Sequence, residues 1–217
     1  MSTPEQRVNT AVADVARTLA DDAVHVWQLD YQRQQRRAPL IAVLAAYLNI
    51  EATGVSLIAG EFGRPALDPR HGSTLDFNWS HSGSQALVAI ARDLAPGIDI
   101  ERVRARPRAL LIAERYFCAE ETAMLAALTE AQRPRAFLEL WTAKEAVLKA
   151  LGRGIAFGLN RVSVAGAPEQ LTLRRLDGED THRWQLQRVD AGAGYIAALA
   201  WRGGPRSVRL GTLAIPL

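Results

Sequence analysis

The stretch FLELWTAKEAVLKALGRG, residues 137–154, places charged side chains on the apolar side of a predicted helix. On a helical wheel of about 100° per residue, its large apolar side chains gather on one arc. These are Phe137, Leu138, Leu140, Trp141, Val147, Leu148 and Leu151. Lys144 lies near the middle of that arc, and Glu145 lies inside its edge. Because an unpaired buried charge costs several kcal/mol, both side chains need polar partners from elsewhere in the chain.

Lys149 stands four residues after Glu145, a spacing that also allows an ordinary surface ion pair. Such a pair would contribute only a few tenths of a kcal/mol. It would explain Lys149, which lies at the edge of the arc. It would not explain why Lys144 and Glu145 lie within the arc, so Glu145 becomes a candidate for a functional site.

The segment GIDIE places two carboxylates on one face of a predicted strand. Because side chains alternate along a strand, Asp99 and Glu101 point to one side, about 7 Å apart. One interpretation is a solvated strand edge. If Glu145 faces the pair instead, three carboxylates could hold one hard divalent cation. Mg²⁺ is favoured, since no His or Cys ligand accompanies them.

The segment FNWSHSG contains Asn78, Ser80, His81 and Ser82, a dense run of hydrogen-bonding side chains near a strand end. Hydroxyl and imidazole groups here could bind a phosphate, or a Ser/His pair could act as a nucleophile. Local capping of a turn is the structural alternative. Arg64, in the loop segment FGRP, has solvent as its default environment.

Hydrophobic periodicity predicts the elements that carry these residues. Helices are expected over residues 4–20, 36–50, 109–117, 119–128 and 134–151. Strands are expected over residues 23–31, 75–93 (two strands joined by a Ser-Gly turn), 96–103, 161–166, 171–176, 182–189 and 194–201. Gly and Pro mark residues 60–73 as a loop.

Each half of the chain reads as helices followed by strands, which predicts an α+β fold of two similar lobes with a cleft between them. We place the boundary near residue 104. Residues 1–104 then form an N-terminal lobe with an extra N-terminal helix, and residues 105–217 form a C-terminal lobe with the WTAKEAVLK helix.

Composition narrows the class of protein. The chain has 217 residues, of which 48% are hydrophobic and 23% charged, as in ordinary soluble proteins. Its net charge of +3 suits phosphate or carboxylate partners and is too small to indicate nucleic acid. The single cysteine, Cys118, favours a reducing compartment. Without a signal-peptide pattern or an apolar membrane span, we expect a cytoplasmic protein with no membrane partner.

Taken in order, the segments FGRP, FNWSHSG, GIDIE and WTAKEAVLK resemble the motif set of the 4'-phosphopantetheinyl transferases, specifically the larger surfactin-synthetase type. The joint occurrence of GIDIE and WTAKEAVLK at this separation is highly specific. The resemblance implies a pseudo-twofold arrangement of two lobes, with coenzyme A bound at the N-terminal lobe and the active site between the lobes.

The resemblance also implies roles for single residues. Asp99, Glu101 and Glu145 would bind Mg²⁺, and Lys149 would contact the phosphates of coenzyme A. A further set would hold other phosphate oxygens: Ser80 and His81 on the 3'-phosphate, and Arg64 on a phosphate. The basic residues Arg33, Arg36 and Arg37 match a nucleotide-binding region without aligning singly, and Lys144 receives no role.

The implied reaction transfers the 4'-phosphopantetheine group from coenzyme A to a serine of an apo acyl or peptidyl carrier protein and releases 3',5'-ADP. Glu145, or a water that it holds, is the candidate base for the serine proton, and Lys149 would stabilise the transferring phosphoryl group. Because carrier proteins tend to be acidic, an extended segment ERVRARPR could be a docking face or merely a solvated one. Its basic residues are Arg102, Arg104, Arg106 and Arg108. The paired lobes favour a monomer.

Two other classes of protein share part of this pattern. A different Mg²⁺-dependent phosphotransferase or nuclease could use the same carboxylates, but the chain has neither a P-loop nor a second carboxylate cluster. A non-catalytic carrier-protein or nucleotide-binding module would keep the basic surface. It would not need Asp99, Glu101 and Glu145 in alignment.

Overall fold

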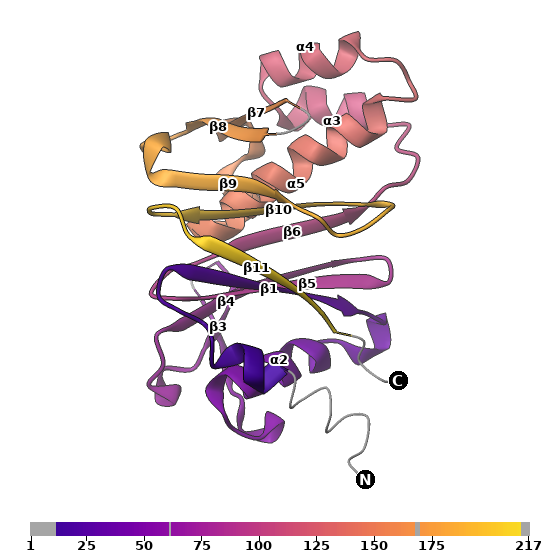
Figure 1. The fold of residues 1–217 in the computed structure, drawn as a ribbon. Coiled ribbons are helices and arrows are strands. Elements are labelled where there is room, and N and C mark those ends of the chain that lie inside the picture. Colours follow the sequence, from indigo (N-terminus) through magenta and orange to yellow (C-terminus); the bar gives the residue numbers. More distant parts are fainter. Residues whose placement is uncertain (1–11, 61, 168–169, 214–217) are drawn as a thin grey trace.

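The computed structural model of the protein describes residues 12–60, 62–167 and 170–213. Two β-sheets lie at the centre, with helices above one and below the other, so that four layers are stacked (Figure 1). The α+β class predicted from the sequence is confirmed.

The first sheet joins strands from both ends of the chain. Its strands are β1 (Ala23–Asp30), β4 (Leu75–Ser82), β5 (Gln85–Arg92) and β11 (Ser207–Leu213). They lie in the order β11-β1-β5-β4. β11 pairs with β1 in parallel, and the other pairs are antiparallel. Helix α2 (Ala38–Leu48) covers the outer face of this sheet, at the bottom of Figure 1.

The second sheet carries the carboxylate strand at its edge. Its strands are β6 (Gly97–Arg102), β9 (Trp184–Val189) and β10 (Tyr195–Arg202), in the antiparallel order β6-β10-β9. Above it lie the three helices α3 (Ala109–Tyr116), α4 (Ala119–Ala127) and α5 (Arg133–Leu151). The described part of the chain also contains two small hairpins, β2 (Leu57–Ala59) with β3 (Pro65–Leu67) and β7 (Val162–Ala167) with β8 (Gln170–Leu176).

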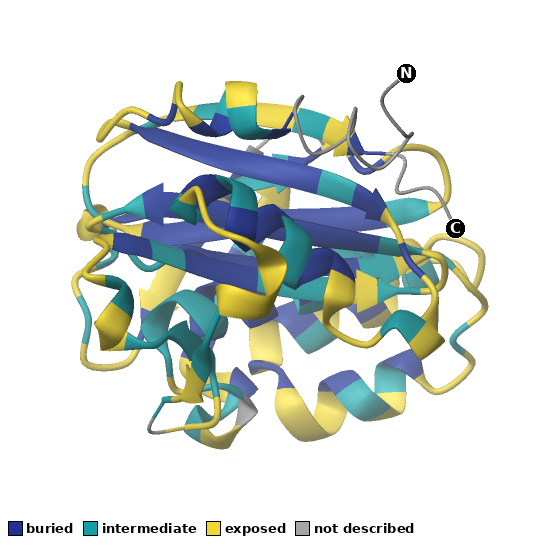
Figure 2. Cartoon of the chain, turned by 90° about the horizontal axis from the view of Figure 1, so that it is seen from below, coloured by how far each residue is buried: buried dark blue, intermediate teal, exposed yellow. Residues whose placement is uncertain are grey.

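Within the described residues, three hydrophobic cores hold the layers together. One lies between α2 and the first sheet, one between the two sheets, and one between the second sheet and helices α3 to α5. The buried, dark blue strands run through the middle of the molecule in Figure 2. In β6, Ile98 and Ile100 enter the core between the sheets. Strand alternation therefore turns Asp99 and Glu101 toward α5.

Local sequence explains the ends of α5. Pro134 stands in its first turn, where a missing N–H costs nothing, and Gly152 ends it in the left-handed conformation with φ of 77°. The structure confirms the helices predicted around residues 36–50, 109–117, 119–128 and 134–151. For the helix predicted over 4–20, residues 12–16 are helical and residues 1–11 lie outside the described part.

Two expectations about strands need correction. Residues 60–73 contain β3, which pairs with β2, because a short antiparallel pair satisfies backbone groups that a loop would leave to solvent. The sequence patterns also do not predict β11. The lobe boundary near residue 104 stays a prediction, and the strand pairing crosses it. β6 joins the sheet of the C-terminal half, while β11 joins that of the N-terminal half.

Candidate active site

Helix α5 lies directly against β6, and this close approach depends on Gly97. A Cβ atom at Gly97 would stand 2.0 Å from the carbonyl oxygen of Ala146 and 2.3 Å from the backbone N of Ala150. Real Cβ atoms essentially never approach backbone atoms this closely. Glycine at this position therefore lets the helix that carries Glu145 and Lys149 contact the strand that carries Asp99.

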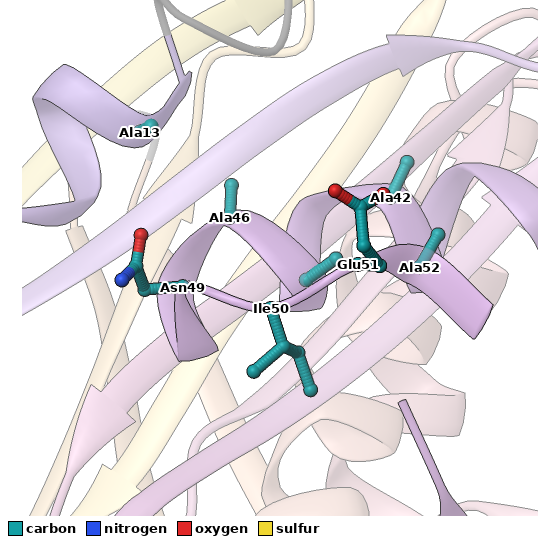
Figure 3. Close-up of a pocket in the computed structure, with 8 residues that line it drawn as sticks. Ala13, Ala42, Ala46, Asn49, Ile50, Glu51 and Ala52 are labelled. Atoms are coloured by element: carbon teal, nitrogen blue, oxygen red, sulfur yellow. The ribbon is translucent and has the colours of Figure 1, made fainter. Parts of the chain in front are cut away.

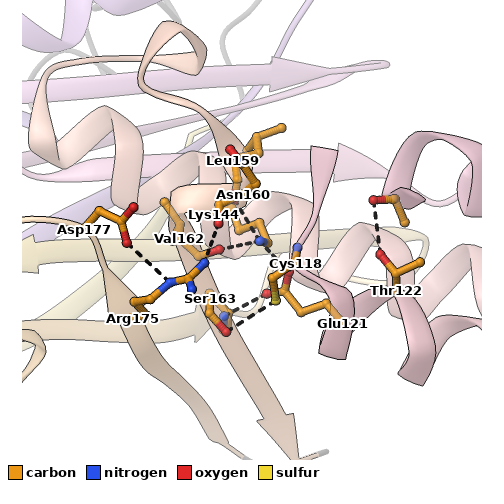
Figure 4. A network of polar contacts seen from close by, with 12 residues as sticks. Cys118, Glu121, Thr122, Lys144, Leu159, Asn160, Val162, Ser163, Arg175 and Asp177 are labelled. Carbon is orange, nitrogen blue, oxygen red and sulfur yellow. Dashed lines mark hydrogen bonds and ion pairs between the residues drawn. The ribbon is translucent and has the colours of Figure 1, made fainter. Parts of the chain in front are cut away.

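Lys144 points into the core of the C-terminal half and has no solvent exposure. Its Nζ forms an ion pair with Glu121 at 2.5 Å and donates hydrogen bonds to the carbonyls of Leu159 (3.0 Å) and Val162 (2.5 Å) (Figure 4). The same ammonium lies 4.6 Å from the ring centroid of Phe117. Lys144 is thus a fully partnered structural lysine, which answers why it lies on the apolar arc.

Glu145 is also buried, with 7% of its surface exposed, but it faces the second sheet's carboxylates. Burial and, after it, the nearby Asp99 carboxylate raise its pKa from 4.5 to about 7, against a lowering by Lys149. Glu101 adds a smaller rise. Oε1 of Glu145 is buried without a hydrogen-bond partner. This oxygen is available to a cation or to a proton.

Asp99 is held by side chains from β4 and from α5. Its Oδ1 accepts hydrogen bonds from Ser80 Oγ and from Lys149 Nζ, both at 2.7 Å. Lys149 also donates to the carbonyl of Ile98 at 3.0 Å. Lys149 therefore pairs with Asp99, and its i,i+4 relation to Glu145 is not the contact that the structure forms.

Glu101 is held by β4 and by the segment that follows β6. Its Oε2 accepts hydrogen bonds from Arg106 and from Ser82 Oγ, both at 3.0 Å. Sequence reasoning missed the contact with Arg106, because it treated that arginine as part of an exposed face. An acidic and a basic residue five apart at a strand end were the available signal.

The three carboxylates are near one another without forming a finished metal site. Across residues 12–60, 62–167 and 170–213, no three His, Cys, Asp or Glu side chains are grouped closely enough to hold a metal ion. Lys149 and Arg106 neutralise Asp99 and Glu101 instead. Oδ2 of Asp99 and Oε1 of Glu145 are nevertheless both buried carboxylate oxygens without a hydrogen-bond partner. Such oxygens fit a hard divalent cation, and metal binding here stays a prediction.

Ser80 and His81 lie on opposite faces of β4. Ser80 donates to Asp99, whereas the His81 ring stacks on Tyr31 with 4.4 Å between the ring centroids. Burial lowers the pKa of His81, and the positive charges of Lys149 and Arg33 lower it further. A positive field thus surrounds His81, which favours a phosphate group nearby.

Arg64 forms an ion pair and hydrogen bonds within the protein. Its guanidinium forms an ion pair with Asp76 at 2.9 Å and donates to the carbonyls of Phe77 (2.8 Å) and Pro96 (3.1 Å). These contacts tie the loop before β3 to β4 and to the start of β6. The proposed contact between Arg64 and a phosphate stays a prediction.

A cavity of about 300 Å³ opens beside Lys149, between β4, the loop around Gly63 and the end of α5. It is lined by basic and aromatic side chains together with glycines. The lining residues are Arg37, Phe62, Gly63, Arg64, Pro65, Phe77, Asn78, Trp79, Lys149, Gly152 and Gly154. Positive charge beside flat apolar surface suits a nucleotide phosphate and its base.

A second hollow, of about 620 Å³, lies beside α2 and is lined mostly by alanines (Figure 3). Its polar lining consists of Asn49 and Glu51. Without a second charged group or a nucleophile among these residues, we place the active site at the cavity beside Lys149.

No helix in the described residues is long and apolar enough to cross a membrane.

Comparison with known proteins gives a consistent family. The family model for the 4'-phosphopantetheinyl transferase superfamily matches residues 95–200. The Synechocystis sp. protein slr0495 is 33% identical over 79% of this chain and 74% of its own length. The 4'-phosphopantetheinyl transferase HetI of Nostoc sp. is 33% identical over 77% of this chain and 73% of its own.

Among solved structures, the holo-[acyl-carrier-protein] synthase of Thermotoga maritima covers 50% of this chain and 62% of its own, with a TM-score of 0.40 and 20% identity. The family assignment rests on the sequence relatives, which extend beyond the two motif segments to most of both chains. The resemblance noted in the sequence is confirmed, and this chain belongs to the 4'-phosphopantetheinyl transferase superfamily.

Proposed function

We propose that this protein transfers the 4'-phosphopantetheine group from coenzyme A to a serine hydroxyl of an apo acyl or peptidyl carrier protein, releasing 3',5'-ADP. The observation that carries the proposal is the meeting of Asp99, Glu145 and Lys149 beside a basic cavity. Family membership supports the reaction class, and this geometry supports the residue roles proposed below.

Coenzyme A would bind with its phosphates toward Lys149 and the basic lining of the cavity. Arg37 and Arg64 line the same cavity, and His81 lies in the positive field of Lys149 and Arg33. A phosphate would relieve the mutual repulsion of these groups. The Trp79 ring offers an apolar surface in the same cavity.

Asp99, Glu101 and Glu145 would hold Mg²⁺, with unpartnered oxygens on Asp99 and Glu145 as the first ligands. When bound, the ion would neutralise charge on the pyrophosphate and on the leaving 3',5'-ADP. Lys149 would then turn from Asp99 toward the phosphate oxygens. Arg106 would release Glu101 in the same way.

Glu145 is the proposed base for the carrier serine. In the protein without a bound cation, burial raises the pKa of Glu145 to about 7, and its unpartnered Oε1 could take the serine proton directly or through a water. The serine oxygen attacks the β-phosphate of coenzyme A, its proton passes to Glu145 directly or through a water, and the bond to the 3',5'-ADP oxygen breaks. Lys149 stabilises the charge on the transferring phosphoryl group.

The intact mass of a carrier protein tests this proposal. An apo carrier incubated with the enzyme, coenzyme A and Mg²⁺ should gain roughly 340 Da, the mass of the covalently attached arm. A reaction with EDTA in place of Mg²⁺ should leave the mass unchanged. If several apo carriers keep their mass under all conditions, a non-catalytic binding module becomes the better description.

The carrier would dock on the basic segment between β6 and α3. Arg104 and Arg108 are exposed there and line a groove of about 280 Å³ that reaches Ala109 and Ile112. Leu111, on the same helix, is 63% exposed. A basic rim beside apolar side chains suits an acidic partner helix. Arg106 also lines this groove, and its guanidinium forms an ion pair with Glu101.

Charge reversal tests the docking surface. Arg104→Glu with Arg108→Glu should raise KM for the carrier about tenfold and leave KM for coenzyme A unchanged, because rim charges act on the partner that they face. Arg183→Glu reverses a single charge at an exposed site outside the groove and should alter neither. Equal effects on both substrates would contradict docking here.

The cytoplasmic location and the monomeric state stay predictions.

A further inference from the structure

Strands β4 and β6 are edge strands of different sheets, yet they lie side by side. They are not neighbours in either sheet's hydrogen-bonded order. Hydrogen bonds that involve side chains of β4 connect the two strands, in place of backbone-to-backbone hydrogen bonds. Asn78, Ser80 and Ser82 follow one another at the strand period of two and share the face that looks toward β6.

Asn78 holds the backbone just before the first carboxylate. Its Oδ1 accepts a hydrogen bond from the N–H of Ile98 at 3.0 Å, and Asn78 is 6% exposed. The carbonyl of Ile98 accepts from Lys149 Nζ at 3.0 Å. Both backbone polar groups of Ile98 are thus fixed by side chains, and Asp99 is the next residue. Without Asn78, the buried N–H of Ile98 would lose its partner.

Ser82 holds both the backbone and the side chain at the second carboxylate, Glu101. Its Oγ accepts from the N–H of Arg102 at 3.0 Å and donates its own proton to Glu101 Oε2 at 3.0 Å. A hydroxyl can donate one hydrogen bond while it accepts another, so the two contacts are compatible. The backbone on one side of Glu101 and its carboxylate are therefore fixed by the same atom.

We infer that Asn78 and Ser82 are positioning residues that fix Asp99 and Glu101 for the divalent cation and the coenzyme A pyrophosphate. The inference rests on the proposed function. It adds that three side chains of β4, those of Asn78, Ser80 and Ser82, form a seam that connects the two sheets at the site. Neither residue is required to touch the transferring phosphoryl group. Each acts by holding the carboxylate strand.

Cation binding measured apart from turnover tests the inference. Mn²⁺ serves as the probe, and electron paramagnetic resonance measures the free ion in the presence of coenzyme A. Asn78→Leu and Ser82→Ala should each weaken Mn²⁺ binding about tenfold, since groups that orient metal ligands change affinity by about 10- to 100-fold. The Mg²⁺ concentration for half-maximal transfer should rise by a similar factor.

Two further variants separate positioning from general stability. Ser82→Thr keeps the hydroxyl and should restore Mn²⁺ binding to within about twofold of the wild type. Thr122→Val removes a side-chain hydrogen bond of the same kind, from Thr122 Oγ1 to the carbonyl of Ala113, away from this seam. It should leave Mn²⁺ binding unchanged.

The outcomes are distinct. Weaker Mn²⁺ binding in Asn78→Leu and Ser82→Ala, with Ser82→Thr restored, supports the inference. If both variants lose only thermal stability and bind Mn²⁺ as the wild type does, the inference is wrong while the proposed function stands. If Asn78→Leu does not fold, the Ser82 pair decides, because Ser82 is only half-buried. A wild type that neither binds Mn²⁺ nor transfers the arm removes the proposed function first.

Discussion

Two neighbouring residues on one helix show how far residue type and environment can diverge. Lys144 and Glu145 both lie on the apolar arc of α5, and both are buried. Lys144 is saturated by an ion pair and two carbonyls, whereas Glu145 keeps an unpartnered oxygen beside like charge. A saturated charge stabilises a fold, and an unsatisfied one marks a site that awaits a ligand or a proton.

At this scale we predict that Lys144→Met destabilises the protein by about 3–5 kcal/mol, because it leaves the Glu121 carboxylate buried and uncompensated. The double variant Lys144→Met with Glu121→Gln should lose less than the single one. Urea unfolding measures both.

Arg135→Met is the control for this prediction, since it breaks a pair with Glu139 in which the arginine side chain is 64% exposed. Its cost should stay below about 1 kcal/mol. A Lys144→Met protein as stable as the Arg135 variant would show that the buried pair is not structural.

At the scale of elements, the site depends on the contact between β6 and α5. β6 is an edge strand of the second sheet, and α5 packs over it so closely that Gly97 touches the helix backbone. The periodicities of two and 3.6 predict each element separately. They do not predict that these two elements meet, which is what brings Asp99 to Lys149.

We predict that Gly97→Ala separates the two elements. The new Cβ would overlap backbone atoms of Ala146 and Ala150, which cannot move as a flexible side chain can. The free energy of unfolding should fall by about 3 kcal/mol, and kcat should fall with it. Urea unfolding and transfer assays give the two values.

Gly204→Ala is the matched control for Gly97→Ala. A Cβ at Gly204 has no heavy atom within 4 Å among those that could obstruct it. This variant should keep the stability and rate of the wild type. If Gly97→Ala behaves the same way, the close contact between β6 and α5 is not needed.

At the scale of the whole molecule, the two ends of the chain are joined in one sheet. β11 pairs in parallel with β1, and Gly211 lies against the ring of Trp27. Near this junction His25 is buried, with Nδ1 2.8 Å from the hydroxyl of Tyr47 on α2. Burial lowers the pKa of His25, and the charge of Arg209 on β11 lowers it further.

This environment predicts how overall stability depends on pH. Because the folded state holds His25 with a pKa below 6.5, the unfolded state binds more protons in acid. The contribution of His25 to stability is therefore complete above about pH 6.5 and is lost progressively as the pH drops toward the pKa of the folded state. His25→Gln should flatten the dependence between pH 6.5 and 5.

Urea unfolding at several pH values measures this slope. His182→Gln replaces an exposed histidine and should leave it as in the wild type. If His25→Gln keeps the full slope as well, other groups carry the acid sensitivity.

The sequence by itself determined the family, the α+β class and most of the helices and strands. Each of these depends on patterns within short segments, such as the alternation in GIDIE or the arc of WTAKEAVLK. It also selected Asp99, Glu145 and Lys149, which the structure brings together.

Tertiary structure alone decided the partners. Lys144 meets Glu121, Asn78 meets Ile98 and β11 meets β1 across long stretches of chain. Residue types fix what each group needs, but the partner depends on which elements pack together. Burial and distance then set the strength of each polar contact, and both exist only after the two sheets have come together.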